Sequence, residues 1–208
     1  MLDPFIHSQN SVSSTITRMA DYQLPIPIIT RRLVIRDAIR SDMRGWSALY
    51  RSPKVRQYMN GPLRRKAQEW WTGQQSLSTE VTRPLSIALP NTNELVGVCG
   101  FFNSSQHSEW EAWLLLRSKF WQVGIGSEVM SALVEVAFSS LAALRVIAIV
   151  DPENNKSLSM LKKLGFGFVS EYSGTSNWQN GHHIYAVEHH TYKFAVEMDA
   201  AKARYSSP

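Results

Sequence analysis

Residues 120–127, Phe-Trp-Gln-Val-Gly-Ile-Gly-Ser, could bind a phosphate group. They join an apolar strand, residues 113–116, to an amphipathic segment that we expect to be a helix, residues 124–141. A glycine-bearing turn that opens a helix leaves several N–H groups unpaired at the positive end of the helix dipole, where a diphosphate fits. The spacing is neither that of a Walker loop nor that of a Rossmann turn. An ordinary tight strand-to-helix connection is the alternative interpretation.

A second pattern follows about thirty residues later in the chain. Residues 144–150 are apolar and largely β-branched, which predicts a strand, and the polar run 151–157 leads into a helix that ends at Lys162-Lys163-Leu164-Gly165-Phe166. We expect Asn154 or Asn155 to cap this helix, Ser157 to lie in its first turn and Gly165 to end it.

The two patterns together resemble the GNAT superfamily of acetyl-CoA-dependent N-acetyltransferases. The matching motifs are Trp-x-x-Gly-x-Gly from Trp121 and Asn-x-x-Ser from Asn154, which leads into Leu-Lys-Lys-Leu-Gly-Phe. The tryptophan before the glycines is similar to the RimJ/RimL-like branch, which acetylates ribosomal-protein N-termini. Residues 30–36 and 180–185 are also similar to that branch. The resemblance spans about residues 30–192 and implies an α/β GNAT (acyl-CoA N-acyltransferase) fold, with a central twisted mixed β-sheet flanked by helices.

The resemblance also implies a site for acetyl-CoA as co-substrate, with no metal. The diphosphate would lie on the turn, and the pantetheine arm would pair with the backbone of Leu114 and Leu116 and be held by Asn154. Ser157 matches the serine proposed to assist the departing thiolate. Asn154 and Ser157 are equally well interpreted as ordinary helix-cap residues. The residues assigned to the diphosphate turn are Gln122, Val123, Gly124, Ile125, Gly126 and Ser127.

Glu111 is the candidate general base. It matches a strand glutamate that many relatives carry, and an acidic side chain within an apolar strand is costly to bury unless it is paired. A salt bridge at the sheet edge is the alternative interpretation. His182 or His183 could serve instead, since histidine titrates near neutral pH, or could simply lie on the surface at the end of a strand. A tyrosine general acid is excluded at position 161, where this chain has Leu161.

The sequence leaves the acceptor open. Leu114 replaces a tyrosine common in the RimJ/RimL-like branch, and Arg117-Ser118-Lys119 replaces its acidic, proline-bearing turn. The resemblance implies a primary amine as acceptor, either a peptide N-terminus or a small molecule such as an amino acid, polyamine or amino sugar, and these departures leave its identity open. Each of five tryptophans is interpreted either as acceptor-pocket lining or as core: Trp70, Trp71, Trp110, Trp113 and Trp178.

Two other functional classes stay open. A protein with this fold could bind an acyl-CoA as a non-catalytic sensor or scaffold. A basic RNA-associated protein would fit the net charge of +5. However, the basic clusters are not interleaved with aromatic residues, so we do not expect nucleic acid as a direct ligand.

The elements that must position these residues can be predicted from periodicity. We expect a strand at residues 33–37, a helix capped by Ser41-Asp42 that runs to Tyr50, and a helix at 65–79. Three strands then form a meander at 85–89, 94–102 and 109–116. After the helix at 124–141 come strand, helix and strand, and a last strand at 182–188.

The 208 residues favour one domain, residues 29–194, between a flexible N-terminal leader, 1–28, and a C-terminal tail, 195–208. No apolar run approaches the ~20 residues that cross a bilayer, so we expect no membrane insertion. A single cysteine, Cys99, excludes an internal disulfide and favours a reducing, cytoplasmic location; we expect Cys99 to be a small buried strand residue. Exposed Tyr185 and Tyr192 would suit the edge of a homodimer.

Overall fold

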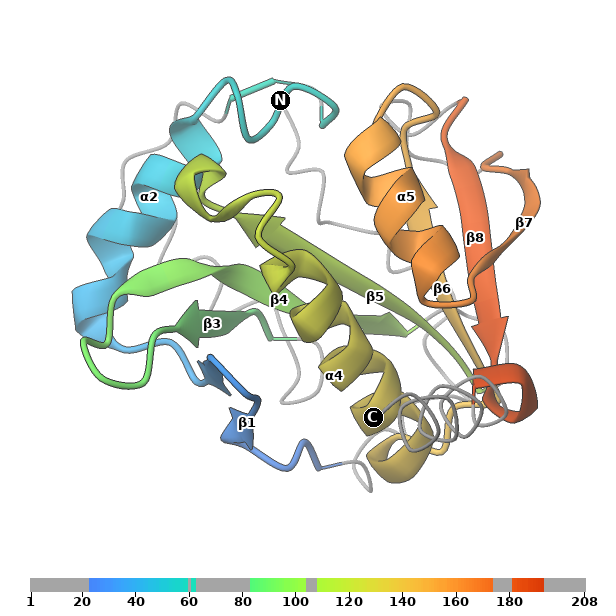
Figure 1. The fold of residues 1–208 in the computed structure, drawn as a ribbon, viewed down its shortest axis with the longest axis horizontal. Coiled ribbons are helices and arrows are strands. Elements are labelled where there is room, and N and C mark those ends of the chain that lie inside the picture. Colours follow the sequence, from blue (N-terminus) through green and yellow to red (C-terminus); the bar gives the residue numbers. More distant parts are fainter. Residues whose placement is uncertain (1–22, 60, 63–82, 104–107, 174–180, 193–208) are drawn as a thin grey trace, which may run out of the picture.

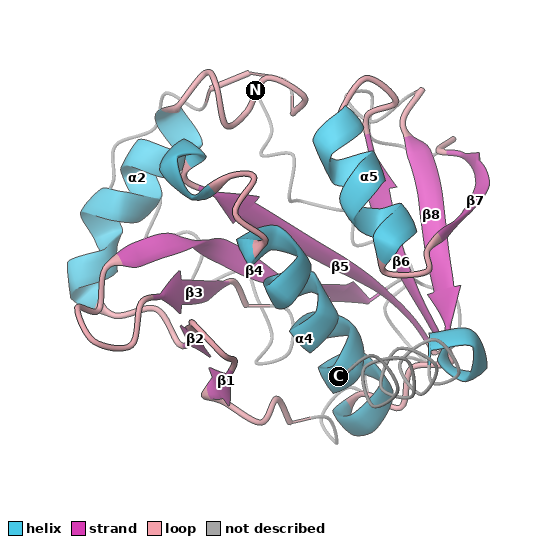
Figure 2. Ribbon diagram, in the orientation of Figure 1, coloured by secondary structure: helices cyan, strands magenta, loops and turns pink. Residues whose placement is uncertain are grey.

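A mixed eight-stranded sheet forms the centre of the protein (Figures 1 and 2). The computed structural model describes residues 23–59, 61–62, 83–103, 108–173 and 181–192. The strand order is β1-β2-β3-β4-β5-β6-β8-β7, with β5 and β6 parallel and the other neighbours antiparallel. The strands are β1 Ile28–Ile29, β2 Val34–Arg36, β3 Leu85–Ala88, β4 Leu95–Asn103, β5 Glu109–Leu116, β6 Arg145–Val150, β7 Gly167–Glu171 and β8 His183–Glu188.

Helices cover both faces of the sheet. Helices α4 (Ile125–Ser140) and α5 (Asn155–Lys163) lie on one face, and α2 (Met43–Arg51) packs on the other. Two short 3-10 helices, Arg40–Asp42 and Ser118–Phe120, precede α2 and the turn into α4. This is the α/β class with a central mixed sheet that the sequence predicts.

Side chains along β5 alternate between the two faces, as a strand requires. Trp110 and Ala112 enter the larger core beneath α4, whereas Trp113 and Leu115 join the smaller cluster beneath α2. By the same alternation, Glu111 lies on the α2 face of the sheet. The larger core includes Leu33, Ile35, Val96, Phe101, Val129 and Leu133, and the smaller one includes Trp46, Leu49, Tyr50, Leu95 and Val98.

The predicted strands and helices within the described residues are confirmed, with boundaries that move by one or two residues. The predicted helix at 65–79 lies outside the described residues. Strand β1 is not among the predicted strands, and it pairs with β2. Leu24, Ile26 and Ile28, which fall in the expected leader, pack against the larger core. The boundaries of leader, domain and tail stay predictions.

Asp42 corrects one detail of the predicted capping. Helix α2 begins where expected, but the Asp42 side chain does not cap it. The buried carboxylate turns back instead, where it accepts hydrogen bonds from Arg36 Nη1 (2.7 Å), the Ile39 N–H (3.0 Å) and Ser86 Oγ (2.8 Å). Burial alone would raise the pKa of Asp42, but these hydrogen bonds outweigh burial and hold the pKa below its ordinary value. Asp42 thus ties the start of α2 to β2 and β3.

Replacement of Asp42 by asparagine should lower the free energy of unfolding at pH 7 by about 2 kcal/mol, because charge-assisted hydrogen bonds to a buried group are weakened. The stability that a lowered carboxyl pKa provides is present above the unfolded-state pKa of 3.8 and is lost as the pH falls through the folded-state value. Urea unfolding at pH 7 and at pH 3 measures both effects. A difference between the two proteins that is as large at pH 3 as at pH 7 would contradict this role.

Candidate active site

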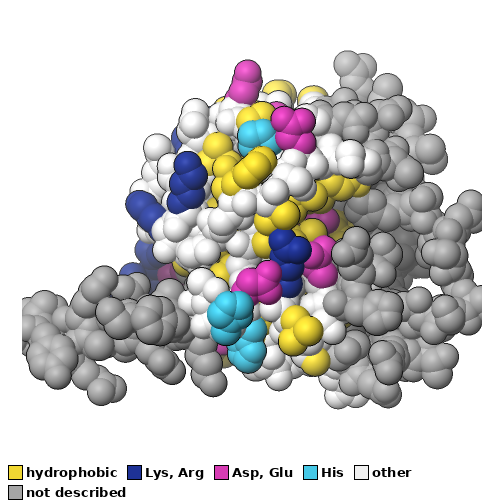
Figure 3. All heavy atoms as spheres, turned by 90° about the vertical axis from the view of Figure 1, so that its right-hand side faces the viewer, with side chains coloured by type: hydrophobic (Ala, Val, Ile, Leu, Met, Phe, Trp, Pro, Cys, Tyr) yellow, Lys and Arg dark blue, Asp and Glu magenta, His cyan; other side chains and the backbone are white. Residues whose placement is uncertain are grey.

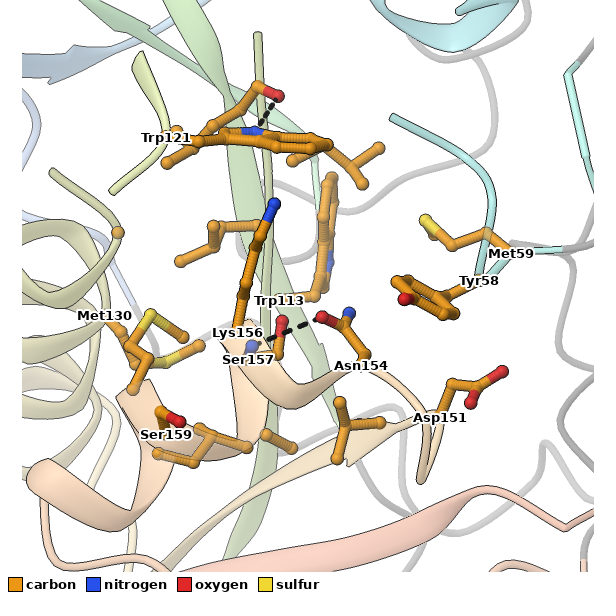
Figure 4. A pocket seen from close by; sticks show the side chains of 18 of the residues that line it. Tyr58, Met59, Trp113, Trp121, Met130, Asp151, Asn154, Lys156, Ser157 and Ser159 are labelled. Carbon is orange, nitrogen blue, oxygen red and sulfur yellow. Dashed lines mark hydrogen bonds between the residues drawn. The ribbon is translucent and has the colours of Figure 1, made fainter. Parts of the chain in front are cut away.

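A cleft opens where β5 and β6 separate. The two strands pair at Glu109↔Arg145, Trp110↔Val146 and Glu111↔Ile147, and then diverge, although β5 continues to Leu116 and β6 to Val150. A cavity of about 680 Å³ lies along the divergence, lined by both strands, α4, α5 and the turn after α2 (Figure 4). A parallel pair that splays in the middle of a sheet leaves unpaired backbone edges facing the gap.

The backbone of Leu114 and Leu116 faces this cleft. The Arg117 N–H donates to the Val96 carbonyl (2.9 Å), and in an antiparallel ladder the residues that bond to the partner strand alternate along the chain. Trp113 and Leu115 therefore bond to β4, whereas Leu114 and Leu116 direct their N–H and C=O groups towards β6. The Leu116 carbonyl accepts a hydrogen bond from Trp121 Nε1 (2.9 Å). The N–H and C=O groups of Leu114 and the N–H group of Leu116 can pair with an extended, amide-bearing ligand.

The start of α4 forms one wall of the cleft. Gly124 is the N-cap residue, with φ of 80°, and Gln122 also has a positive φ, 62°. Glu128 is the first residue whose N–H bonds back along the helix, to the Gly124 carbonyl, so the preceding N–H groups have no partner within the helix. Of the predicted turn residues, four line the cavity, namely Gln122, Gly124, Gly126 and Ser127. Val123 is 54% exposed and Ile125 is buried, and neither lines it.

The start of α5 forms the opposite wall, with the Asn154 and Ser157 side chains on the cleft side (Figure 4). Asn154 is the cap residue, since its Oδ1 accepts a hydrogen bond from the Ser157 N–H at 3.2 Å. Among the described residues, no hydrogen bond uses the side-chain NH₂ of Asn154 or the Ser157 hydroxyl. Both groups are therefore free to meet a ligand, and capping does not exclude a binding role.

Two lysines contact the indole of Trp121, and all three residues line the cavity. Lys156 Nζ lies 4.8 Å from the indole centre (Figure 4). Lys54 Nζ lies 5.7 Å from the same centre, and both distances are within the range of cation–π contacts. Lys54 follows α2 and Lys156 belongs to α5, so the two cations come from different sides of the cavity that both line. They give this end of the cleft a positive charge that favours a polyanionic ligand.

Glu111 lines the same cavity and is 9% exposed. Its register neighbours are apolar, Phe102 on β4 and Ile147 on β6, and no described residue donates a hydrogen bond to its carboxylate. Glu111 therefore forms no salt bridge with a described residue, and the alternative interpretation, a salt bridge at the sheet edge, is wrong. Burial raises the pKa of Glu111 to about 7. The pKa of Tyr172 is also raised, mainly by the burial of Tyr172 and to a smaller extent by the nearby charge of Glu111. A carboxyl with a pKa near 7 can exchange protons at neutral pH.

His182 also lines the cavity and is buried, so it is not a surface residue. Its Nε2 lies 3.4 Å from the Tyr58 carbonyl oxygen and 4.0 Å from Asp151 Oδ2. His183 does not line the cavity; its ring packs edge-on against Phe168. Of the two histidines considered as bases, the structure places His182 at the cleft.

The five candidate tryptophans have different locations. Trp113 lines the cavity, stacked on Phe102 with ring centres 5.7 Å apart. A Cβ at Gly100 would lie 3.0 Å from the Trp113 ring, so this strand position needs glycine for the indole to lie flat. Trp110 is a core residue, 1% exposed. The other three, Trp70, Trp71 and Trp178, lie outside the described residues.

Sequence reasoning missed several lining residues: Lys54, Tyr58, Met59, Phe102, Asp151 and Lys156. Tyr58 and Met59 follow α2 and are brought to the cleft only by the tertiary fold (Figure 4). Lys156 and Asp151 could have been noticed, because both stand in or beside the quoted Asn-x-x-Ser motif.

The remaining expectations concern cysteine and the two tyrosines. Cys99 is buried on β4, which raises its pKa and makes a nucleophilic role unfavourable. Tyr185 is buried, and Tyr192 packs on the core with its hydroxyl 3.0 Å from Ser131 Oγ, so the expectation that both are exposed is wrong. On the face that carries β7, apolar side chains lie among acidic, basic and histidine side chains (Figure 3).

Within the described part of the chain, no group of three or more His, Cys, Asp or Glu side chains could hold a metal ion. In that same part, every helix is too short or too polar to span a bilayer.

The comparisons with known proteins agree with this architecture. The family model described as "Acetyltransferase (GNAT) domain" matches residues 32–167. The uncharacterized N-acetyltransferase p20 of Bacillus licheniformis is 29% identical over 154 residues, which cover 70% of this chain and 86% of the relative.

Two solved structures with bound CoA compounds have similar folds. Spermidine N-acetyltransferase from Vibrio cholerae, in complex with CoA and spermine, has a TM-score of 0.64 at 15% identity and covers 78% of this chain and 98% of its own. RimJ from Mycobacterium smegmatis, in complex with CoA-disulfide, has a TM-score of 0.60 at 20% identity and covers 76% of this chain and 82% of its own. The expected fold is thereby confirmed.

Proposed function

Because the chain belongs to the GNAT acetyltransferase family, we propose that it is an N-acetyltransferase that moves the acetyl group of acetyl-CoA to a primary amine by direct attack. The observation that carries the proposal is the position of Glu111. This buried carboxyl, with a pKa near 7, lies in the same cleft as the turn that opens α4. A proton acceptor and an anion site in one cleft are what amine acetylation by an anionic thioester requires.

Each chemical step has a candidate residue. Glu111 would accept a proton from the acceptor ammonium, directly or through a water molecule. The neutral amine would then form a bond to the acetyl carbonyl carbon, the carbon–sulfur bond would break, and the sulfur would leave as a thiolate. Ser157 would donate a hydrogen bond to that thiolate, which takes up the proton released by the attacking nitrogen. Position 161 is leucine, so it offers no tyrosine hydroxyl as a general acid.

Acetyl-CoA, the co-substrate of the family, fits the residues present. Gln122, Gly124, Gly126 and Ser127 would hold the diphosphate, and the open backbone of Leu114 and Leu116 would pair with the amides of pantetheine. Val123 and Ile125 would contribute only through the backbone of the turn. The NH₂ group of Asn154 would hold the arm from the opposite wall.

The nature of the acceptor is a second part of the proposal. The acceptor would approach Glu111 past Tyr58, Met59, Phe102 and Trp113, which line the cavity. The resemblance of the motifs to the RimJ/RimL-like branch favours a peptide N-terminus, and a small-molecule amine is the alternative. A cytoplasmic location also belongs to the proposal, since the lone Cys99 is a free thiol. The homodimer stays a prediction, because the two tyrosines that suggested it are not exposed.

A melting-temperature measurement with and without acetyl-CoA tests the co-substrate first. At about 100 times its Kd, a ligand that binds only the native state adds about 2.7 kcal/mol, which should raise the melting temperature by about 5 °C or more. A thiol-release assay over a panel of peptide and small-molecule amines then tests turnover. No shift at millimolar acetyl-CoA would refute the proposal. A shift with no turnover on any amine would favour the non-catalytic acyl-CoA sensor.

A further inference from the structure

Arg32 and Glu128, ninety-six positions apart in the chain, form an ion pair next to the turn that opens α4. We call this pair, together with Thr30, the clasp. The Glu128 carboxylate accepts hydrogen bonds from Arg32 Nε (2.6 Å), the Arg32 N–H (2.8 Å) and Thr30 Oγ1 (2.6 Å). Burial alone would raise the pKa of Glu128, but these bonds outweigh it and hold the pKa below its ordinary value. The clasp therefore carries an ionised carboxylate.

The same guanidinium also contacts the turn. Arg32 Nη1 donates to the Val123 carbonyl at 2.8 Å, and Arg32 Nη2 lies 3.3 Å from where a Cβ of Gly124 would be. In a trans peptide the carbonyl and the following N–H point in opposite directions. Because Arg32 holds the Val123 carbonyl, the Gly124 N–H points away from the guanidinium.

Glu128 creates an electrostatic difficulty for the proposed diphosphate site. It lies in the first turn of α4, within reach of the N–H groups that would hold an anion. A bare carboxylate there would repel a second anion and would reduce the positive potential at the helix start. Arg32 supplies the compensating charge, and its side chain is 35% exposed, so the compensation is partly screened by solvent.

We propose that Arg32 is a positioning residue of the diphosphate turn: it neutralises Glu128 and fixes the Val123 carbonyl, so that the N–H groups of the turn meet an anion without a competing charge. This inference rests on the proposed function, since it assumes that acetyl-CoA lies on the turn. It assigns a ligand-binding consequence to an ion pair that does not itself line the cavity.

A double-mutant cycle tests this role by direct titration with CoA. Arg32→Met should raise the Kd of CoA about tenfold, because it exposes the Glu128 charge at the helix start. The double variant Arg32→Met/Glu128→Gln should bind only about threefold more weakly than the wild type, because the competing charge is gone and only the hydrogen bond to the Val123 carbonyl is still missing. Arg31→Met, which removes an equal charge from the exposed neighbouring side chain, should change the Kd less than about twofold.

Two further measurements separate positioning from simple loss of structure. Both Arg32→Met and the double variant lose the clasp, so both should melt below the wild type, whereas only the double variant recovers CoA affinity. Acetyl-pantetheine lacks the diphosphate, so its kcat/KM should stay within about twofold of wild type in Arg32→Met. Arg32→Lys keeps the charge, and should bind CoA more tightly than Arg32→Met does.

The proposal is overturned if Arg32→Met binds CoA as well as the wild type does, or if the double variant binds as weakly as Arg32→Met. Both results leave the proposed function standing, since the wild type still binds CoA. If the wild type itself fails to bind CoA, the proposed function and this inference are both wrong.

Discussion

Replacement of Glu111 by glutamine is expected to lower kcat by about 100- to 1000-fold at pH 8, because it removes the group that we propose accepts the amine proton. Glutamine keeps the shape of the side chain but cannot take up a proton. The affinity for CoA should stay unchanged, since Glu111 lies on the opposite face of β5 from α4. Steady-state kinetics with saturating acetyl-CoA, alongside direct CoA titration, separate the two quantities.

The pH dependence of the wild type provides an independent test of the same residue. A general base acts in its ionised form, and burial raises the pKa of Glu111 to about 7. We therefore expect kcat/KM to rise with pH below about 7 and to level off above it. The Glu111→Gln variant should lose this inflection and keep only the titration of the acceptor amine.

Glu109→Gln is the matched control. Glu109 lies two residues earlier on β5, its carboxylate is 3.3 Å from Arg145 Nη1, and it does not line the cavity. Its kcat and pH profile should match the wild type. If Glu111→Gln and Glu109→Gln both behave like the wild type, Glu111 is not the base, and His182 becomes the residue to test.

Glu111 should also affect the stability of the protein in a definite direction. Its pKa is higher in the folded protein, about 7, than the ordinary value of 4.5, so the folded state binds more protons between these values. The corresponding stability is fully present below about pH 4.5 and is lost as the pH rises to about 7. Above pH 7, Glu111→Gln should be more stable than the wild type by about 3 kcal/mol, as an upper bound. Chemical denaturation at pH 4.5 and pH 8 would reveal the difference.

The elements of this fold could be predicted because their signals are local. Alternation of apolar side chains predicts β3, β4 and β5, and Gly124 and Gly165 mark a helix start and a helix end at positions with φ near 80°. Asn154 similarly carries its capping role in its own sequence neighbourhood. Strand β1 was missed because it has two residues, too few to show any period.

The properties of the site depend on contacts between distant segments, which no local pattern contains. The divergence of β5 from β6 creates the cavity, and it arises from where two strands thirty residues apart stop pairing. The raised pKa of Glu111 depends on neighbours in β4 and β6, and the charge state of Glu128 depends on Arg32. The sequence could therefore nominate Glu111 for its unusual place in an apolar strand. It could not show that no described residue forms a hydrogen bond or a salt bridge with the Glu111 carboxylate.

Gly124→Glu is expected to weaken CoA binding by about 100-fold or more, because it places a negative charge and a bulky side chain in the turn proposed to hold the diphosphate. Gly124 has φ of 80°, and a Cβ there would lie 3.3 Å from Arg32 Nη2, so some backbone strain accompanies any substitution. Isothermal titration with CoA measures the affinity, and the melting temperature without ligand measures the strain.

Two control variants separate charge at the turn from strain and from charge elsewhere. Gly124→Gln adds nearly the same bulk and the same φ strain without the charge, so it should bind CoA more tightly than Gly124→Glu does. Gly165→Glu adds the charge at φ of 82°, in open space after α5 and away from the cavity, so it should bind CoA like the wild type. If Gly124→Glu also retains wild-type affinity while folded, the diphosphate does not lie on this turn. If Gly124→Gln and Gly124→Glu weaken CoA binding equally, the loss of affinity is caused by the shape of the new side chain and not by charge repulsion.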